Sequence, residues 1–179
     1  MLEDFDIQKY LNKKPPSDNS NTTKQEILEL TKIPIREKFI KEMDDGKKVM
    51  KNIVGNDPLI GKLISESRPI IDKIKEHHDR PRPKVLAKKM GIKMQDIELK
   101  TMKTPSYPSG HSTQAYLMGL ALSDKYPNKK DKLMKAARDI SYSRRVAHAH
   151  YKSDSLFGEQ IGKDMYNHIK DKIWVNKKY

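Results

Sequence analysis

The chain has 179 residues, with 37 Lys and Arg against 24 Asp and Glu, and a formal net charge of +13. This length suits one domain with one core. The longest near-continuous apolar run, residues 115–122, is far shorter than the roughly 20 residues that cross a bilayer, which excludes an integral membrane protein. The absence of cysteine excludes disulfides, cysteine–zinc sites and thiol nucleophiles. The charge favours an anionic partner, whether nucleic acid, a membrane surface or a phosphorylated small molecule.

The N-terminal segment is polar and interrupted by proline, as its run KKPPSDNSN at residues 13–21 illustrates. This composition predicts a flexible or loosely docked arm over residues 1–21, with one short helix, and a helical domain over residues 22–179. The first residues are acidic and no apolar signal-peptide segment follows them. We therefore expect a cytoplasmic protein, or a periplasmic or secreted one if a leader has been removed.

From residue 22 onward the apolar spacing is helical almost throughout, without convincing strand alternation, so the predicted fold class is all-α. Thr23 and Glu26 have the spacing of a capping box at the start of the first helix. Pro34 interrupts or restarts this helix, which we expect to continue to about residue 43.

The middle of the chain carries clear start and stop signals for helices. Asp57 before a proline predicts a helix N-terminus, and Pro69 is expected to divide that helix into two pieces. The RPRP run at residues 80–83 ends any helix. Residues 110–125 are apolar on nearly every side, which predicts a helix buried at the centre of a bundle. A final helix is expected from near Ser153.

Three short segments concentrate residues that suit phosphate chemistry. They contain Lys75 with Arg82, then Pro-Ser-Gly-His at residues 108–111, then Arg144, His150 and Asp154. A phosphomonoester carries nearly two negative charges, and one pair of unit charges 4 Å apart is worth about 4 kcal/mol at an effective dielectric near 20. Lys75, Arg82 and Arg144 could together neutralise such a group, so that no metal ion is required.

Two further placements follow from helix geometry. Ser109 and Gly110 would lie at the start of the buried helix, where free backbone N–H groups and the helix dipole favour an anion. His150 and Asp154 are four residues apart. On a helical turn the carboxylate can therefore hold one imidazole nitrogen and leave the other directed at phosphorus.

Taken in order, these segments resemble the type 2 phosphatidic acid phosphatase (PAP2) superfamily, which includes the bacterial non-specific acid phosphatases and the vanadium haloperoxidases. The family pattern is Lys, six residues, Arg-Pro; then Pro-Ser-Gly-His; then Ser-Arg, five residues, His, three residues, Asp. This sequence matches every specified position over residues 75–154. The wording SYPSGHST at residues 106–113 is closest to the soluble acid phosphatases. The resemblance implies a single-domain helical bundle of the PAP2 and vanadium haloperoxidase type.

The resemblance also implies the roles of the residues. His150 would be the nucleophile that forms a phosphohistidine, Asp154 would fix its tautomer, and His111 would protonate the leaving oxygen and then activate water. The residues implied to bind the substrate phosphate are Lys75, Arg82, Ser109, Gly110 and Arg144. The expected function is a soluble phosphatase that hydrolyses phosphomonoesters without a metal or other cofactor.

The first segment has two registers. Lys73 with Arg80 satisfies the same spacing as Lys75 with Arg82. The adjoining Glu-His at residues 76–77 matches the acid phosphatases better in the second register, so we favour Lys75 and Arg82, and the first register stays open.

Two other functions are alternatives. A vanadate-dependent haloperoxidase would hold vanadate in the same cationic pocket, and a basic nucleic-acid-binding protein would account for the net charge. We expect no nucleic-acid partner, because the sequence has no recognised reader motif and few aromatic residues among its basic runs. The substrate, the pH optimum and the oligomeric state, a homodimer included, stay open. Arg80, Tyr107, Tyr142 and His148 are candidate liners of the pocket.

Overall fold

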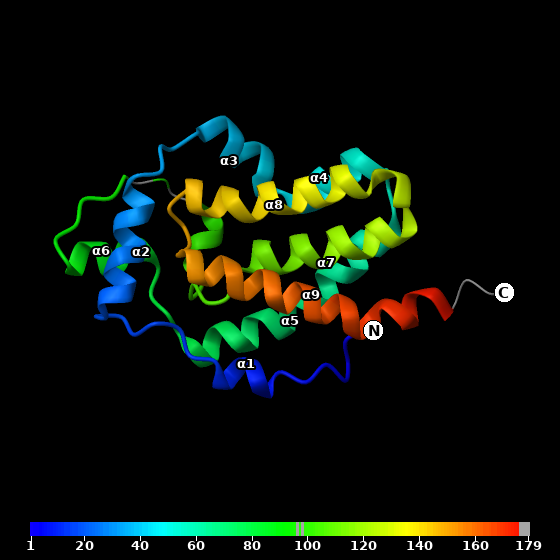
Figure 1. Cartoon of the computed structure of the whole chain (residues 1–179), viewed down its shortest axis with the longest axis horizontal. Coiled ribbons are helices and arrows are strands. Elements are labelled where there is room, and N and C mark those ends of the chain that lie inside the picture. Colours follow the sequence, from blue (N-terminus) through cyan, green and yellow to red (C-terminus); the bar gives the residue numbers. More distant parts are fainter. Residues whose placement is uncertain (96, 98, 176–179) are drawn as a thin grey trace.

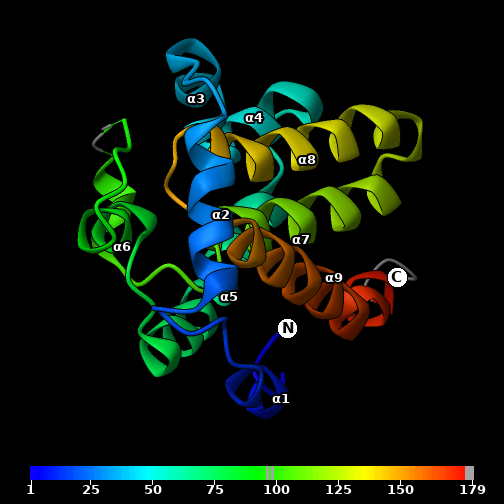
Figure 2. The same cartoon turned by 60° about the vertical axis from the view of Figure 1, so that its left-hand side comes forward.

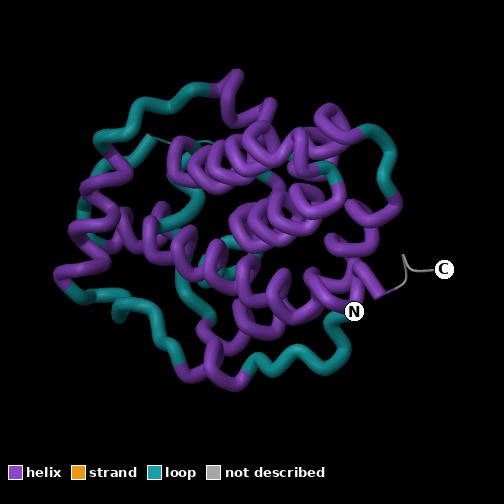
Figure 3. Tube along the Cα trace, turned by 45° about the vertical axis from the view of Figure 1, so that its right-hand side comes forward, coloured by secondary structure: helices purple, strands orange, loops and turns teal. Residues whose placement is uncertain are grey.

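The structure is a computed structural model that describes residues 1–95, 97 and 99–175 of the chain. These residues contain no strand, and Figure 3 shows helices joined by loops, so the predicted all-α class is confirmed. In chain order the elements are α1 (Gln8–Asn12), α2 (Asn21–Thr31), α3 (Glu37–Asp44), α4 (Gly46–Val54), α5 (Pro58–His78), α6 (Pro83–Lys89), the 3₁₀ helix η1 (Lys100–Lys103), α7 (Gly110–Lys125), the 3₁₀ helix η2 (Pro127–Lys129), α8 (Lys130–Val146) and α9 (Lys152–Val175).

Helix α7 forms the centre of the bundle. It packs along α8 and α9, as Figure 1 shows, and it also contacts α4 and α5. Most of its side chains are buried, among them Leu117 and Leu122, which have no exposed surface. The predicted central helix is therefore confirmed, with the bounds that the sequence indicated, because a segment that is apolar on all sides can be stable only inside.

Two glycines on α9 allow α7 and α9 to approach closely. A Cβ at Gly158 would lie 2.5 Å from the carbonyl oxygen of Ser109, and one at Gly162 would lie 2.4 Å from that of Thr113. Either side chain would force the helices apart. The close approach brings the first turn of α9 against the start of α7, where the backbone N–H of Ser109 donates to the carbonyl oxygen of Asp154 at 3.1 Å.

Helix α5 begins as the sequence predicted but does not divide at Pro69. The Asp57 side chain accepts a hydrogen bond from the Leu59 N–H and caps the helix. The expectation that Pro69 separates two pieces is wrong, because α5 continues to His78 with this proline inside it. An interior proline costs about 3 kcal/mol, but the apolar stripe continues past it, with Ile71 and Ile74 both in the core.

The start of α2 differs from the prediction of a capping box. Its cap is Ser20, whose hydroxyl accepts from the Thr23 N–H at 3.1 Å, so Thr23 with Glu26 is not a capping box. The helix ends at Thr31, and the segment expected to run to about residue 43 is a separate helix, α3. Glu26 is thereby left to bond to α9 instead.

The N-terminal segment lies against α5 and α9. Leu2 and Tyr10 belong to the main hydrophobic core, and the Tyr10 hydroxyl donates to Asp164 at 2.5 Å. The backbone carbonyl of Tyr10 accepts from His78 Nε2 at 2.8 Å. No helix in the described part of the chain has the length and apolar character needed to span a membrane.

Candidate active site

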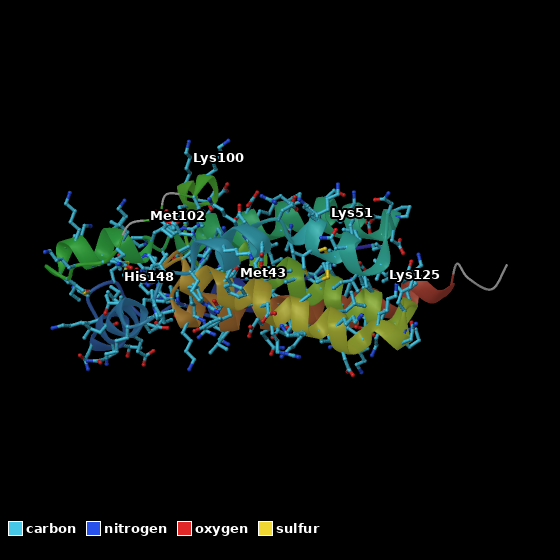
Figure 4. The ribbon with its side chains drawn as sticks, turned by 90° about the horizontal axis from the view of Figure 1, so that it is seen from above. Met43, Lys51, Lys100, Met102, Lys125 and His148 are labelled. Atoms are coloured by element: carbon cyan, nitrogen blue, oxygen red, sulfur yellow. The ribbon has the colours of Figure 1, made fainter. Side chains whose placement is uncertain are left out.

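A cavity of about 540 Å³ opens between α5, α7, α8 and the junction of α3 with α4. Its wall brings together residues from all three segments singled out in the sequence: Lys75, Arg82, Gly110, His111, Arg144 and His150. Lys100, labelled in Figure 4 on the short helix η1, also lines it. Segments separated by some 70 residues of sequence therefore meet around one hollow.

His150 and Asp154 form the buried pair at the floor of this cavity. Nδ1 of His150 lies 3.0 Å from Oδ2 of Asp154, and Nε2 lies 2.9 Å from Nη1 of Arg82. A guanidinium can only donate, so Nε2 must accept and carries a lone pair. The proton of the neutral imidazole is then on Nδ1, which donates to Asp154.

The position of Asp154 follows from the start of α9. It is the third residue of that helix, and its Oδ2 also accepts from the backbone N–H of Tyr151, just before the helix, at 3.1 Å. This is the reciprocal half of a capping box. The fully buried carboxylate has a raised pKa because of desolvation, and the guanidinium of Arg80 opposes that rise. Burial, and then the facing cations Arg82 and Lys75, hold the pKa of His150 well below its usual range.

Lys75 and Arg82 meet at Thr104. Lys75 Nζ donates to the Thr104 hydroxyl at 3.0 Å, and Arg82 Nε donates to the Thr104 carbonyl at 2.8 Å. Arg82 Nη1 also donates to the carbonyl of Ala149 at 3.0 Å. Both cations are largely buried, and burial, followed by repulsion from Arg82, lowers the pKa of Lys75 to about 8. The two cations are thus fixed before any ligand binds.

Arg144 and His111 are linked by Asp44, the last residue of α3. Arg144 Nη1 donates to Oδ1 of Asp44 at 3.0 Å, and His111 Nε2 donates to its backbone carbonyl at 2.8 Å. Nη2 of Arg144 is buried without a hydrogen-bond partner among the described residues. Burial and the charge of Arg144 lower the pKa of His111 to about 4, so the imidazole is neutral at pH 7.

The N-terminus of α7 contributes backbone rather than hydroxyl groups. The Ser109 side chain caps the helix by accepting from the Ser112 N–H at 3.2 Å, and it is completely buried. Gly110, the first residue of the helix, lines the cavity. The first N–H groups of an α-helix have no acceptor within it, and they carry the positive end of the helix dipole.

Of the two registers in the first segment, the structure brings Lys75 and Arg82 to the cavity. Lys73 is exposed on α5, and Arg80 is buried behind the His150–Asp154 pair.

None of the further liners considered in the sequence lies on the cavity wall. Tyr107 stacks on Phe157 with ring centroids 4.1 Å apart, and Tyr142 is exposed on α8. His148 is buried and bonds to the carbonyl of Ile33 at 2.9 Å, and Figure 4 shows it toward the end of the molecule.

Sequence reasoning missed Thr104 and Asp44, which contact the cations directly. Asp44 is the last residue of α3, and Thr104 lies in a loop without a recognisable pattern. Neither residue belongs to a motif that could be singled out in the sequence. Within the described part of the chain, no three His, Asp or Glu side chains converge in an arrangement that could hold a metal ion.

The chain belongs to the PAP2 superfamily. The family model matches residues 61–163, more than half of the chain and the whole span from Lys75 to Asp154. Two curated relatives, the non-specific acid phosphatases of Salmonella typhimurium and Salmonella typhi, are each 33% identical over 88 residues. The match covers 49% of this chain but only 35% of each relative, so it spans about a third of their length.

Proposed function

We propose that this chain is a phosphatase that hydrolyses phosphomonoesters through a phosphohistidine on His150 and without a metal ion. The carrying observation is the buried Nη2 of Arg144, which has no partner among the described residues and belongs to the same cavity wall as the lone pair on His150. A buried donor of this kind requires an explanation. A phosphate oxygen would satisfy it, and PAP2 membership supports the same reaction.

In the first step, Nε2 of His150 attacks phosphorus as the bond to the leaving oxygen breaks. Arg82 Nη1, which now caps that nitrogen, would transfer its hydrogen bond to a phosphate oxygen and so free the lone pair. Lys75 and Arg144 would balance the charge on the equatorial oxygens. The leaving oxygen takes its proton from His111.

His111 is prepared for that transfer by its bond to the backbone of Asp44. This bond occupies Nε2, so Nδ1 is the nitrogen left to exchange a proton with substrate. The pKa of His111 is about 4 because of burial and the charge of Arg144. A bound phosphate dianion would screen Arg144 and raise the pKa of His111. Substrate binding would therefore favour protonation of His111 at Nδ1, the form that can act as the acid.

In the second step, a water molecule attacks the phosphorus of the phosphohistidine. His111 accepts a proton from this water, the P–N bond breaks, and inorganic phosphate leaves. Asp154 stays bonded to Nδ1 throughout and stabilises the positive charge that develops on the His150 ring.

The experiment is hydrolysis of p-nitrophenyl phosphate with and without EDTA, together with trapping of labelled phosphate on the protein in alkali, where phosphohistidine persists. We expect turnover to be unaffected by EDTA and the label to be lost in His150→Ala. That variant should lose at least about 10³-fold in kcat. Vanadate, which resembles the pentacoordinate phosphoryl group, should inhibit the enzyme.

His77→Ala is the matched control, because this histidine is exposed on α5 and lies outside the cavity wall. Full turnover in His150→Ala would eliminate the mechanism, and loss of turnover in EDTA would eliminate metal independence. Halide oxidation with peroxide and vanadate, without phosphate release, would favour a haloperoxidase instead.

A further inference from the structure

Arg80 is one of the most deeply buried charged side chains of the protein, yet it lies outside the cavity wall. Its Nη1 donates to Oδ1 of Asp154 at 2.8 Å and to the hydroxyl of Ser153 at 2.8 Å. Its guanidinium carbon lies 3.7 Å from the ring centroid of Tyr151. Arg80 therefore holds the face of Asp154 that is turned away from His150.

Glu26 extends this arrangement to another helix. Its Oε2 accepts from Arg80 Nη2 at 3.3 Å and from the Ser153 hydroxyl at 2.8 Å, and its Oε1 accepts from the Ser153 N–H at 2.7 Å. Figure 2 shows α2 passing the N-terminal end of α9, where these bonds form. A carboxylate of α2 thus satisfies a free N–H in the first turn of α9, the turn that carries Asp154.

The state of His150 depends on the charge of Asp154. An ionised carboxylate accepts from Nδ1–H and keeps the lone pair on Nε2, the tautomer that the Arg82 contact requires. A protonated Asp154 would have a hydrogen to donate, and the imidazole could then carry its proton on either nitrogen. Complete burial favours the protonated form, so a fixed counter-charge is needed behind the carboxylate.

We propose that Arg80 and Glu26 are positioning residues of this reaction: Arg80 keeps Asp154 ionised, and Glu26 holds Arg80 and the first turn of α9 in register. The proposal rests on the proposed function only in taking His150 as the nucleophile. Neither residue touches the cavity, so both act through Asp154 on the tautomer and direction of His150.

The other charged and titratable groups around Asp154 do not replace Arg80. From α5 and the loop before α6, Lys75 and Arg82 act on Asp154 through space, and His150 is its direct partner on the opposite side. Tyr107 and Tyr151 also face it, and burial raises the pKa of both, so that they stay neutral. Arg80 is thus the cation in direct contact with the carboxylate among the described residues.

The test compares Arg80→Met, Arg80→Lys and Glu26→Gln with wild type, and Glu29→Gln is the matched control on the exposed side of α2. The first readout is the ¹⁵N shift of each His150 ring nitrogen in histidine-labelled full-length protein, assigned by its loss in His150→Gln. The second is the pH profile of kcat and KM for p-nitrophenyl phosphate. Far-UV circular dichroism gives the folded fraction.

We expect His150 to carry its proton on Nδ1 in wild type and to show mixed tautomers in Arg80→Met. In that variant kcat should fall about 10²-fold, because a wrong tautomer removes the attacking lone pair. KM should change less than about threefold, since the phosphate cradle is intact. Arg80→Lys should recover at least tenfold of the loss, and Glu26→Gln should lose about tenfold.

A wild-type tautomer and kcat in folded Arg80→Met would overturn the proposal. If Arg80→Met does not fold, the same comparison is made with Arg80→Lys and Glu26→Gln, and wild-type shifts and pH profiles in both would overturn it equally. A merely structural role would lower the folded fraction without altering the shifts. Absence of phosphatase activity in wild type would defeat the proposed function, and the ring shifts would still decide whether Arg80 sets the tautomer.

Discussion

Arg80 and Arg82 are two residues apart in one RPRP run, and both are buried, yet they lie on opposite sides of the His150–Asp154 pair. At the rear, Arg80 bonds to two carboxylates, Asp154 and Glu26. On the cavity side, Arg82 bonds to the carbonyl oxygens of Thr104 and Ala149 and to the imidazole of His150. Arg80 thus bonds to two carboxylates behind the pair, whereas Arg82 reaches the imidazole of His150 itself from the cavity side.

On the proposed function, the difference separates a cation held between two carboxylates from cavity cations that would contact a phosphate, of which Arg144 also pairs with Asp44. A buried charge is tolerable when it is paired, as Arg80 is by Asp154 and Glu26, although its Nε has no hydrogen-bond partner among the described residues. On the cavity wall, Lys75 donates to a hydroxyl, and Nη2 of Arg144 finds no partner among the described residues. A phosphate group would complete these shells.

The largest effect is expected on stability, at the rear. Arg80→Met leaves Asp154 and Glu26 without their counter-charge, and breaking a buried pair in this way costs about 3–5 kcal/mol. Urea denaturation at pH 7 measures the free energy of unfolding. Arg138→Met, an exposed substitution on α8, should change it by less than about 0.5 kcal/mol. A loss below about 1 kcal/mol in Arg80→Met would show that the ion pairs of Arg80 with Asp154 and Glu26 do not stabilise the fold.

The next effect is expected on catalysis, at the cavity. Arg144→Met should lower kcat/KM for a phosphomonoester by about 10²–10³-fold, because a donor aimed at the developing charge is lost. Its free energy of unfolding should change by about 1 kcal/mol or less, since only Asp44, 41% exposed, loses a charged partner. Arg145→Met is the control, because that neighbour lies over the Tyr142 ring. Equal losses of kcat/KM in Arg144→Met and Arg145→Met would contradict the assignment of Arg144 to phosphate binding.

The sequence was sufficient to predict the central helix, and its three motifs do meet around one cavity. Residues 110–125 had no polar face to expose, so their burial was determined locally. Pro69 was misjudged because a local rule met a longer apolar stripe, and packing against the core outweighed the broken hydrogen bond. Thr23 was misjudged because Ser20 offers an equally good cap three residues earlier.

The sequence was not sufficient to separate the two sides of the site. Spacing alone could not distinguish Arg80 from Arg82, because a proline-rich turn decides which way each one faces. Glu26, the partner that holds Arg80, is 54 residues away from it in sequence. Such a contact exists only once α2 has packed against the start of α9, and it leaves no periodic signal in the chain.

A third effect is expected on the pH dependence of the free energy of unfolding, through His111 on the cavity side. The pKa of His111 is about 4 when folded, against 6.5 in the unfolded chain, because of burial and Arg144. Between these values the unfolded chain binds a proton that the folded protein does not, so stability falls as the pH drops from 6.5 to 4. The loss is at most on the order of 3 kcal/mol, since the ring is 22% exposed.

Urea denaturation of the protein from pH 7.5 to 4.5, without added phosphate, measures this slope. It should become less steep in His111→Gln, with a remainder from His150, whose pKa is also held low, and it should stay unchanged in His77→Gln, whose histidine is exposed on α5. Phosphate at 100 times its dissociation constant should restore about 2.7 kcal/mol. A slope that is identical in all three proteins would assign the acid sensitivity to other groups.

The smallest effect distinguishes the two lysines of the first segment. The pKa of Lys75 is about 8 because of burial and Arg82, so above pH 8 the cavity loses this charge. We expect kcat/KM to fall about tenfold per pH unit there. Lys75→Arg should start from a lower kcat/KM, because a planar fork replaces a point charge, but should keep it up to about pH 10. Lys73→Arg, on the exposed face of α5, should retain the wild-type decline. If Lys73→Arg instead abolished the decline, the lysine that faces phosphate would be Lys73, and the division between cavity and rear would have to be redrawn from α5 onward.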